Sequence, residues 1–310
     1  MKKTTVDITL FPVIDYRHKY LFLGSCFSEN LSEKMKENGF AMKNNPFGVV
    51  FNPISLADFF LLSDEKIKDS VFLRDDLALS WLANSTCFAY DKKELQDKLI
   101  QQRQFFLEEI ADAKMLFVTF GTAWVYENNE SQSLVANCHK IPQNKFSKRL
   151  LTIEEIVAKW KKVIALLKEL NPSLDIVFTL SPVRHVKDGL AENARSKATL
   201  LNAIYQLVEE ERQLRYFPAY EIVLDELRDY AYYTIDGVHP NELAIAEIWE
   251  KFKATYFTAE TKQINAELIQ LKQLMNHRLQ HPESKASIAF LQDVLKRKEA
   301  FVKKYDFVNL

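Results

Sequence analysis

Three short apolar runs, each closed by a glycine or a Ser-Pro pair, do most to limit the folds open to this chain. They lie at 20–23, 115–120 and 175–180. Amphipathic helical patterns fill the intervening segments, notably 91–111 and 152–170. Strands of this length that alternate with helices predict a doubly wound parallel sheet of the α/β class, with helices on both faces. We expect this domain to occupy 1–257.

The remainder, 258–310, has a different pattern. It is rich in Lys, Glu and Gln, and Ile264, Leu268 and Leu271 recur at helical spacing. A break at 281–284 separates this helix from a second amphipathic one. We predict a C-terminal α-helical hairpin that packs against the domain or against another subunit, so a homo-oligomer through these helices is one expectation.

Composition excludes several classes of function. The formal net charge is −1, which argues against nucleic-acid and membrane-surface partners. Cys26, Cys87 and Cys138 are widely spaced and form no CxxC pair, so neither a zinc site nor a disulfide framework is indicated. No signal peptide and no run of about 18 apolar residues is present. We therefore expect a cytoplasmic protein with no metal and no cofactor.

The turn at 24–29 joins the first apolar run to a helical pattern. Gly24 lets the chain turn, and Ser25 follows it beside the helix N-terminus, where backbone N–H groups favour negative charge. An open α/β sheet binds its ligand at such strand ends. Ser25 is thus a candidate nucleophile, although a Ser/Gly turn can also merely cap a helix. Cys26 is adjacent, and it either points into the core or acts as a thiol nucleophile.

A second turn, at 234–241, carries a complementary pair. Asp236 and His239 lie three residues apart around Gly237, and Pro240 is expected at the first position of a following helix. With this spacing, Asp236 can orient the imidazole while His239 faces a hydroxyl. Those are the roles of orienter and general base in a Ser-His-Asp triad.

Together these turns resemble the SGNH (GDSL-like) hydrolase superfamily, and in particular its GSCFA family, with Ser28 where the family name has Ala. The resemblance covers about residues 20–255 and includes 45–53, 119–124, 137–142 and 181–185. It implies a flavodoxin-like sheet, Ser25 as nucleophile, His239 as base and Asp236 as orienter. It also implies small acyl esters, including O-acetylated carbohydrates, as substrates. Two alternatives are a coenzyme A-dependent acyltransferase using the same triad and a catalytically inactive ligand-binding module.

The resemblance further implies an oxyanion hole and shows one departure from it. Gly48 fits the second backbone donor beside the Ser25 N–H. The superfamily's third donor is an Asn two residues after a glycine, but here Gly121 is followed by Thr122 and Ala123. The candidates to replace that donor are Asn45, Thr122, Asn137 and His139. We expect Asn45 or His139 to reach the crevice.

Two further loop residues are candidates for substrate binding. Arg184 either clamps an anionic group of the substrate or pairs with Asp188. His185 follows it, and a loop histidine is either a ligand-binding group or a structural hydrogen-bonding residue.

Overall fold

The computed structural model describes residues 4–310, and its centre is a five-stranded parallel sheet of order β10-β9-β5-β1-β2. The strands are β1 (Lys19–Gly24), β2 (Ala41–Asn44), β5 (Ala113–Phe120), β9 (Asp175–Leu180) and β10 (Leu214–Phe217). The chain leaves β1 for β2 on one side and continues to β5 on the other, so the strand order reverses between β1 and β5. This is the flavodoxin-like order, and the predicted doubly wound sheet is confirmed.

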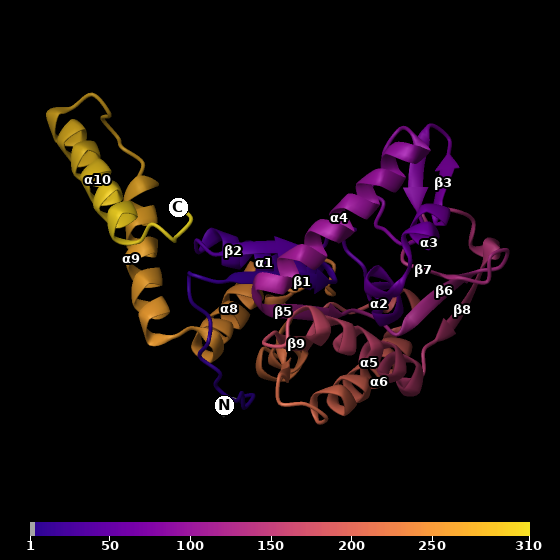
Figure 1. Ribbon diagram of the computed structural model, residues 1–310. Helices are drawn as coiled ribbons and strands as arrows, with labels where there is room; N and C mark the ends of the chain where they lie inside the picture. Colours follow the sequence, from indigo (N-terminus) through magenta and orange to yellow (C-terminus); the bar gives the residue numbers. More distant parts are fainter. Residues whose placement is uncertain (1–3) are drawn as a thin grey trace.

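Helices cover both faces of the sheet, as Figure 1 shows. The main ones are α1 (Cys26–Glu37), α2 (Pro53–Leu61), α3 (Asp64–Asp69), α4 (Lys92–Asp112), α5 (Ile153–Leu170), α6 (Leu190–Val208) and α8 (Glu242–Tyr256). One core contains side chains of α2, α4, α5 and α6, and the other contains those of α1 and α8. β1 serves both cores because alternate side chains point to opposite faces: Leu21 and Leu23 to the first, Tyr20 and Phe22 to the second.

Local sequence signals explain most helix starts. Thr152 and Glu155 form a capping box at α5, and Asn52 caps α2 with Pro53 in its first turn. Pro240 is the exception, because Asn241 is the N-cap of α8 and the helix begins at Glu242, two residues later than expected. The Asn241 side chain accepts the Ala244 N–H, a stronger capping interaction than proline provides.

Two small antiparallel sheets flank the main sheet. One is the hairpin β3 (Val71–Arg74) and β4 (Leu77–Ser80), and the other pairs β6 (Trp124–Asn128) with β7 (Leu134–Val135) and β8 (Phe146–Leu150). The segments 71–73 and 86–90 both have strand-like composition, but only the first forms a strand. Its partner is β4, and 86–90 contributes only an isolated bridge through Ala89 to Ala78.

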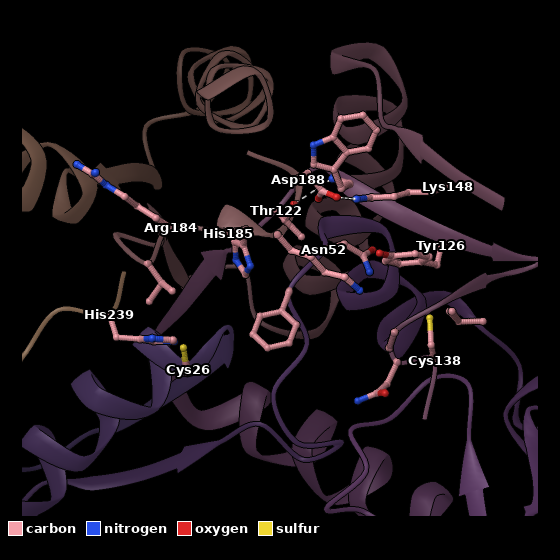
Figure 2. Close-up of a pocket in the computed structure, with 17 residues that line it drawn as sticks. Cys26, Asn52, Thr122, Tyr126, Cys138, Lys148, Arg184, His185, Asp188 and His239 are labelled. Atoms are coloured by element: carbon pink, nitrogen blue, oxygen red, sulfur yellow. Dashed lines mark hydrogen bonds and ion pairs between the residues drawn. The ribbon is translucent and has the colours of Figure 1, made fainter. Parts of the chain in front are cut away.

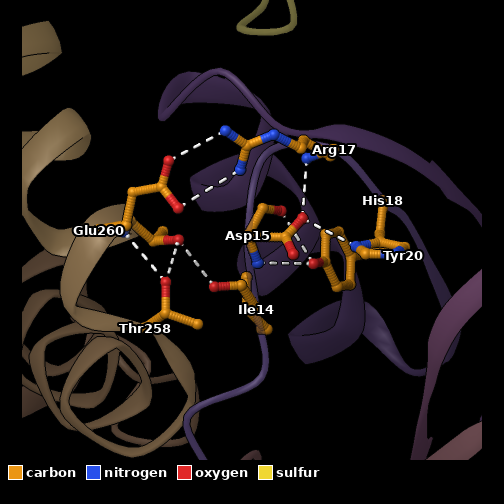
Figure 3. Close-up of polar contacts among 8 residues, drawn as sticks. Ile14, Asp15, Arg17, His18, Tyr20, Thr258 and Glu260 are labelled. Carbon is orange, nitrogen blue, oxygen red and sulfur yellow. Dashed lines mark hydrogen bonds and ion pairs between the residues drawn. The ribbon is translucent and has the colours of Figure 1, made fainter.

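The C-terminal region forms the expected helical pair, α9 (Ala259–Met275) and α10 (Lys285–Lys304), which projects from the β2 end of the sheet in Figure 1. The N-terminal lead-in ties α9 to the domain. Arg17 pairs with Glu260 at 2.9 Å, as Figure 3 shows, and Thr261 Oγ1 donates to the Ile14 carbonyl. Whether these helices also join two subunits stays a prediction. Within 4–310 no helix has the length and apolarity needed to cross a membrane.

Candidate active site

A pocket of about 560 Å³ opens where the loops after β1, β5 and β9 converge. The loop after β1 contributes Cys26, and the loop after β5 contributes Thr122. The loop after β9 contributes Val183, Arg184, His185, Lys187 and Asp188. His239 enters from the turn before α8. The pocket therefore lies at the carboxyl ends of the strands beside the point where the strand order reverses, which is where open α/β sheets bind ligands.

Asp236 and His239 form the pair expected from their spacing. His239 Nδ1 lies 2.6 Å from Asp236 Oδ2. The other carboxylate oxygen accepts from Thr234 Oγ1 at 2.6 Å and from the backbone N–H groups of Val238 and His239. The Thr234 hydroxyl, these N–H groups and the imidazole hold the pKa of Asp236 well below its usual range. An ionised Asp236 accepts the Nδ1 proton, which leaves Nε2 of His239 as an acceptor.

Ser25 does not complete this pair. Its residue is 1% exposed, and its buried Oγ has no hydrogen-bond partner, so the expected Ser25–His239 hydrogen bond is not formed. Gly24 holds the turn tightly against β5, since a Cβ at this position would overlap with the Thr119 carbonyl. The Ser25 N–H donates a hydrogen bond to the same Thr119 carbonyl, at 3.3 Å. Ser25 is thus buried in the turn and is not among the residues that line the pocket.

Cys26 takes the exposed position instead. It is the first residue of α1, it is half-buried, and it lines the pocket together with His239. Figure 2 shows its thiol and the His239 imidazole turned toward one another at one end of the pocket. Burial and the Glu29 carboxylate raise the pKa of the Cys26 thiol, while the N–H groups of Phe27 and Cys26 and the charge of Lys197 lower it by less.

Two predicted oxyanion residues, Gly48 and Asn45, have structural roles. The Gly48 N–H closes a turn onto the Asn45 carbonyl at 2.8 Å. The Asn45 side-chain oxygen accepts the Gly24 N–H at 2.8 Å, so Asn45 is buried beneath the β1 turn. Neither lines the pocket. The expectation that Asn45 presents its side chain to the crevice is therefore wrong, because Gly24 requires that oxygen.

The loop after β5 is also fully hydrogen-bonded. The N–H groups of Gly121 and Thr122 both donate to the Phe51 carbonyl, at 2.8 and 3.0 Å. The Ala123 N–H donates to Ser196 Oγ, which also lies 3.1 Å from Thr122 Oγ1. Only the Thr122 side chain lines the pocket. This loop shapes the pocket wall and contributes the Thr122 hydroxyl. Its backbone N–H groups are already hydrogen-bonded within the protein, so they are not free to bind an oxyanion.

The loop at 137–140 reaches the pocket through the candidate Asn137 and through Cys138, but not through His139 as we expected. His139 turns the other way and is buried, with Nε2 2.7 Å from the Ser80 carbonyl and Nδ1 3.0 Å from Ser85 Oγ. It ties this loop to the β3–β4 hairpin, so the expectation that His139 faces the crevice is wrong. The Asn137 side-chain oxygen accepts the His139 N–H at 2.7 Å.

Arg184 and His185 both line the pocket. Asp188 pairs with Lys148 and not with Arg184. The Arg184 guanidinium lies 5.3 Å from the centre of the Tyr233 ring. Among residues 4–310, no carboxylate lies within ion-pair distance of Arg184. Burial and the nearby charge of Lys197 lower the pKa of His185 to about 4, so its imidazole is neutral. Nε2 of His185 is buried with no hydrogen-bond partner.

The far end of the pocket was not anticipated from sequence. Lys148, on β8, lies 4.9 Å from the centre of the Trp124 ring and 5.5 Å from that of Tyr126, and it pairs with Asp188. Figure 2 shows Lys148 and Tyr126 at the opposite end from Cys26. The strand β8 carried no strong strand pattern, so nothing in the sequence placed Lys148 beside these rings.

Lys197 is the second residue that sequence reasoning missed. It is 2% exposed, and its ammonium donates at 2.7 Å to the carbonyls of Gly121 and Ser181, the residues directly after β5 and β9. Burial lowers its pKa to about 7. A signal was available, because Lys197 shares the apolar face of α6 with Leu200 and Ile204 at helical spacing. Lys197 holds together two strand ends that carry pocket loops.

Within residues 4–310 there is no group of three or more His, Cys, Asp or Glu side chains placed to hold a metal ion.

The profile of the GSCFA family matches residues 19–252, three quarters of the chain. The chain belongs to the GSCFA family. The matched segment begins at β1 and ends within α8, so it contains every pocket-lining residue from Cys26 to His239 and leaves the α9–α10 pair outside. No curated protein matches this GSCFA sequence.

Two solved structures share distant similarity with this GSCFA protein. An acetyl xylan esterase from the rumen bacterium Butyrivibrio proteoclasticus has a TM-score of 0.41 at 10% identity, covering 83% of this chain and 66% of that chain. A carbohydrate esterase family 3 structure from Talaromyces cellulolyticus has a TM-score of 0.31 at 8% identity, covering 81% and 97%. Both likenesses are too distant to indicate an activity or a substrate here.

Proposed function

We propose that this pocket catalyses the hydrolysis of small acyl esters, with His239 as general base and Asp236 as its orienter. One observation carries the proposal: His239, fixed through Nδ1 to Asp236 at 2.6 Å, lines a pocket at the carboxyl ends of β1, β5 and β9. A carboxylate that fixes the tautomer leaves Nε2 free to take a proton from a nucleophile and return it to the leaving alcohol.

A paired histidine alone would not suffice, as a second pair in this chain illustrates. His18 Nδ1 lies 2.8 Å from Asp15 Oδ1 with the same spacing of three residues, also half-exposed. His18 lines none of the pocket that contains His239. The distinction lies in the surroundings, because His239 shares its pocket with a nucleophile on the β1–α1 turn, where first-turn N–H groups lack helical acceptors.

The developing negative charge on the substrate oxygen needs donors that Ala123 cannot supply. Two groups support the proposal. The first turn of α1 presents N–H groups and the positive end of the helix dipole next to Cys26. The His185 imidazole lines the pocket and is held neutral by burial, and its Nε2 is itself buried, so it would hydrogen-bond an oxyanion only after a side-chain movement that uncovers this nitrogen.

The far end of the pocket suggests the class of alcohol. Trp124 and Tyr126 offer aromatic surface, and the Lys148–Asp188 pair and Asn137 offer polar groups. A ligand with both apolar ring faces and hydroxyl groups matches such a lining, and O-acetylated carbohydrates have both. An acyl transfer from coenzyme A would use the same residues, with an acceptor alcohol in place of water.

The direct test is acetate release from p-nitrophenyl acetate and from acetylated monosaccharides by purified protein, compared with Asp236→Asn. We expect this variant to lose kcat by about 10³- to 10⁴-fold, because asparagine no longer fixes the imidazole tautomer. Asp229→Asn is the matched control: Asp229 accepts the Ala231 N–H on the same segment and lies outside the pocket lining.

The control should keep wild-type turnover. Equal turnover in wild type and Asp236→Asn would show that the pair is not catalytic. If the wild type turns over no ester while a saccharide binds, the ligand-binding module becomes the better account.

A further inference from the structure

The proposed function leaves open which side chain of the β1–α1 turn attacks the ester. We propose that the thiol of Cys26, and not the hydroxyl of Ser25, forms the covalent bond to the acyl group. The inference rests on the proposed function, and it changes the expected intermediate from an oxygen ester to a thioester.

Ser25 and Cys26 differ in how accessible they are from the pocket. Cys26 lines the pocket, whereas Ser25 is 1% exposed and its Oγ is buried without any partner. An attacking atom must come within about 3–3.5 Å of the substrate carbonyl carbon. A substrate bound in this pocket can approach Cys26 Sγ, but it would reach Ser25 Oγ only if the turn rearranged. Gly24 opposes that rearrangement because it packs directly on the Thr119 carbonyl.

His239, the proposed general base, faces Cys26. Cys26 and His239 lie at one end of the pocket with thiol and imidazole turned toward one another (Figure 2). No hydrogen bond joins the two groups, and such contacts often tighten only when substrate binds. Ser25 Oγ forms no hydrogen bond with His239 either, and it is buried.

The surroundings suit a thiol that is deprotonated during attack. The N–H groups of Cys26 and Phe27 lie beside the sulfur at the start of α1, and the buried Lys197 adds a positive charge nearby. Burial nevertheless raises the pKa of the thiol above its ordinary value, so it carries its proton at neutral pH. A protonated thiol needs a general base at the moment of attack, and His239 Nε2 is the free acceptor at that end.

The reaction balances with these groups. Cys26 Sγ forms a bond to the acyl carbon while the thiol proton passes to His239 Nε2. The carbon–oxygen bond to the alcohol breaks, and His239 returns the proton to the departing alcohol. Water then attacks the thioester, His239 takes a proton from that water, and the carbon–sulfur bond breaks as the proton returns to Cys26. An acceptor alcohol in the second step would give acyl transfer instead.

The decisive experiment compares Cys26→Ala with Ser25→Ala, using p-nitrophenyl acetate and thermal unfolding of each variant. We expect Cys26→Ala to lose turnover by about 10³-fold or more while it remains folded. Ser25→Ala should stay within about threefold of wild type, with an unchanged or raised Tm, because it removes a buried hydroxyl that has no partner.

Alkylation supplies a second measurement on the unmodified protein. Iodoacetamide should abolish turnover in step with modification of Cys26, located by peptide mass spectrometry, and saturating ester should slow both. Inactivation that does not follow Cys26 modification would overturn the inference.

The outcomes separate the two proposals. Turnover that survives in Cys26→Ala, or that is lost in Ser25→Ala, overturns the role of Cys26 and leaves the proposed function standing. A wild type without turnover on any ester overturns the proposed function itself, and the inference falls with it.

Discussion

Replacing His239 with alanine should lower kcat for p-nitrophenyl acetate by about 10³-fold or more, with little change in Tm. The loss follows from the geometry: Asp236 holds Nδ1, and no other histidine at this end of the pocket has a carboxylate partner. Without the imidazole, neither the attacking group nor the leaving alcohol has a proton carrier. The side chain is half-exposed, so little packing is lost. Steady-state kinetics and thermal unfolding of the purified variant measure both quantities.

His18→Ala provides the matched control. It removes the other His–Asp pair of the same spacing, on the N-terminal lead-in shown in Figure 3. Turnover in this variant should equal that of the wild type. A similar fall in both variants would mean that the loss reflects general destabilisation and that His239 has no special role.

The second large effect concerns stability. Lys197→Met should lower the free energy of unfolding by about 2–5 kcal/mol, because it leaves the carbonyls of Gly121 and Ser181 buried without their donor. The methionine side chain retains most of the volume, so the effect isolates the hydrogen bonds. Urea unfolding measures it, and Lys161→Met, which removes only a surface pair with Glu210, should cost less than about 1 kcal/mol.

The same lysine predicts a pH dependence. Its pKa is about 7 in the folded protein and 10.5 as the reference value, so between these values the unfolded chain binds a proton that the folded protein does not. Stability contributed by Lys197 therefore rises with pH through this window, by at most about 1.4 kcal/mol per unit. The neutral amine still has two N–H groups, enough for both carbonyls. The stability difference between wild type and Lys197→Met should widen from pH 7 to 9, and a narrowing difference would contradict this assignment.

Much of the fold could be predicted because its signals are local. The buried strands β1, β5 and β9 are continuous apolar runs, and the capping box at Thr152 and the Asn52 cap lie within four residues of the helix starts they mark. The strands β8 and β10 could not be predicted from an apolar run, because only part of each strand is buried. Their place in a sheet depends on partners far along the chain, and a sequence pattern does not reveal those partners.

The candidate site likewise contains some contacts that the sequence predicts and others that it does not. Asp236 and His239 are three residues apart on one turn, so their contact could be predicted from spacing. Ser25 and Cys26 are neighbours at a point where the backbone changes from strand to helix, and such neighbours point in different directions. Which of them meets the pocket depends on Gly24 packing against Thr119, a contact between distant segments. Lys197 reaches the site through an equally distant contact, with Gly121, whereas Asn137 was a candidate from the sequence and does line the pocket.

The most direct test of acyl-ester chemistry at this pocket is a double-mutant cycle on kcat/KM for p-nitrophenyl acetate, with His239→Ala, Asp236→Asn and the double variant. If Asp236 acts only through His239, the double variant should be no slower than His239→Ala alone, since residues that work as one unit are strongly non-additive. Losses that multiply in the double variant, or single variants as fast as the wild type, would contradict the account.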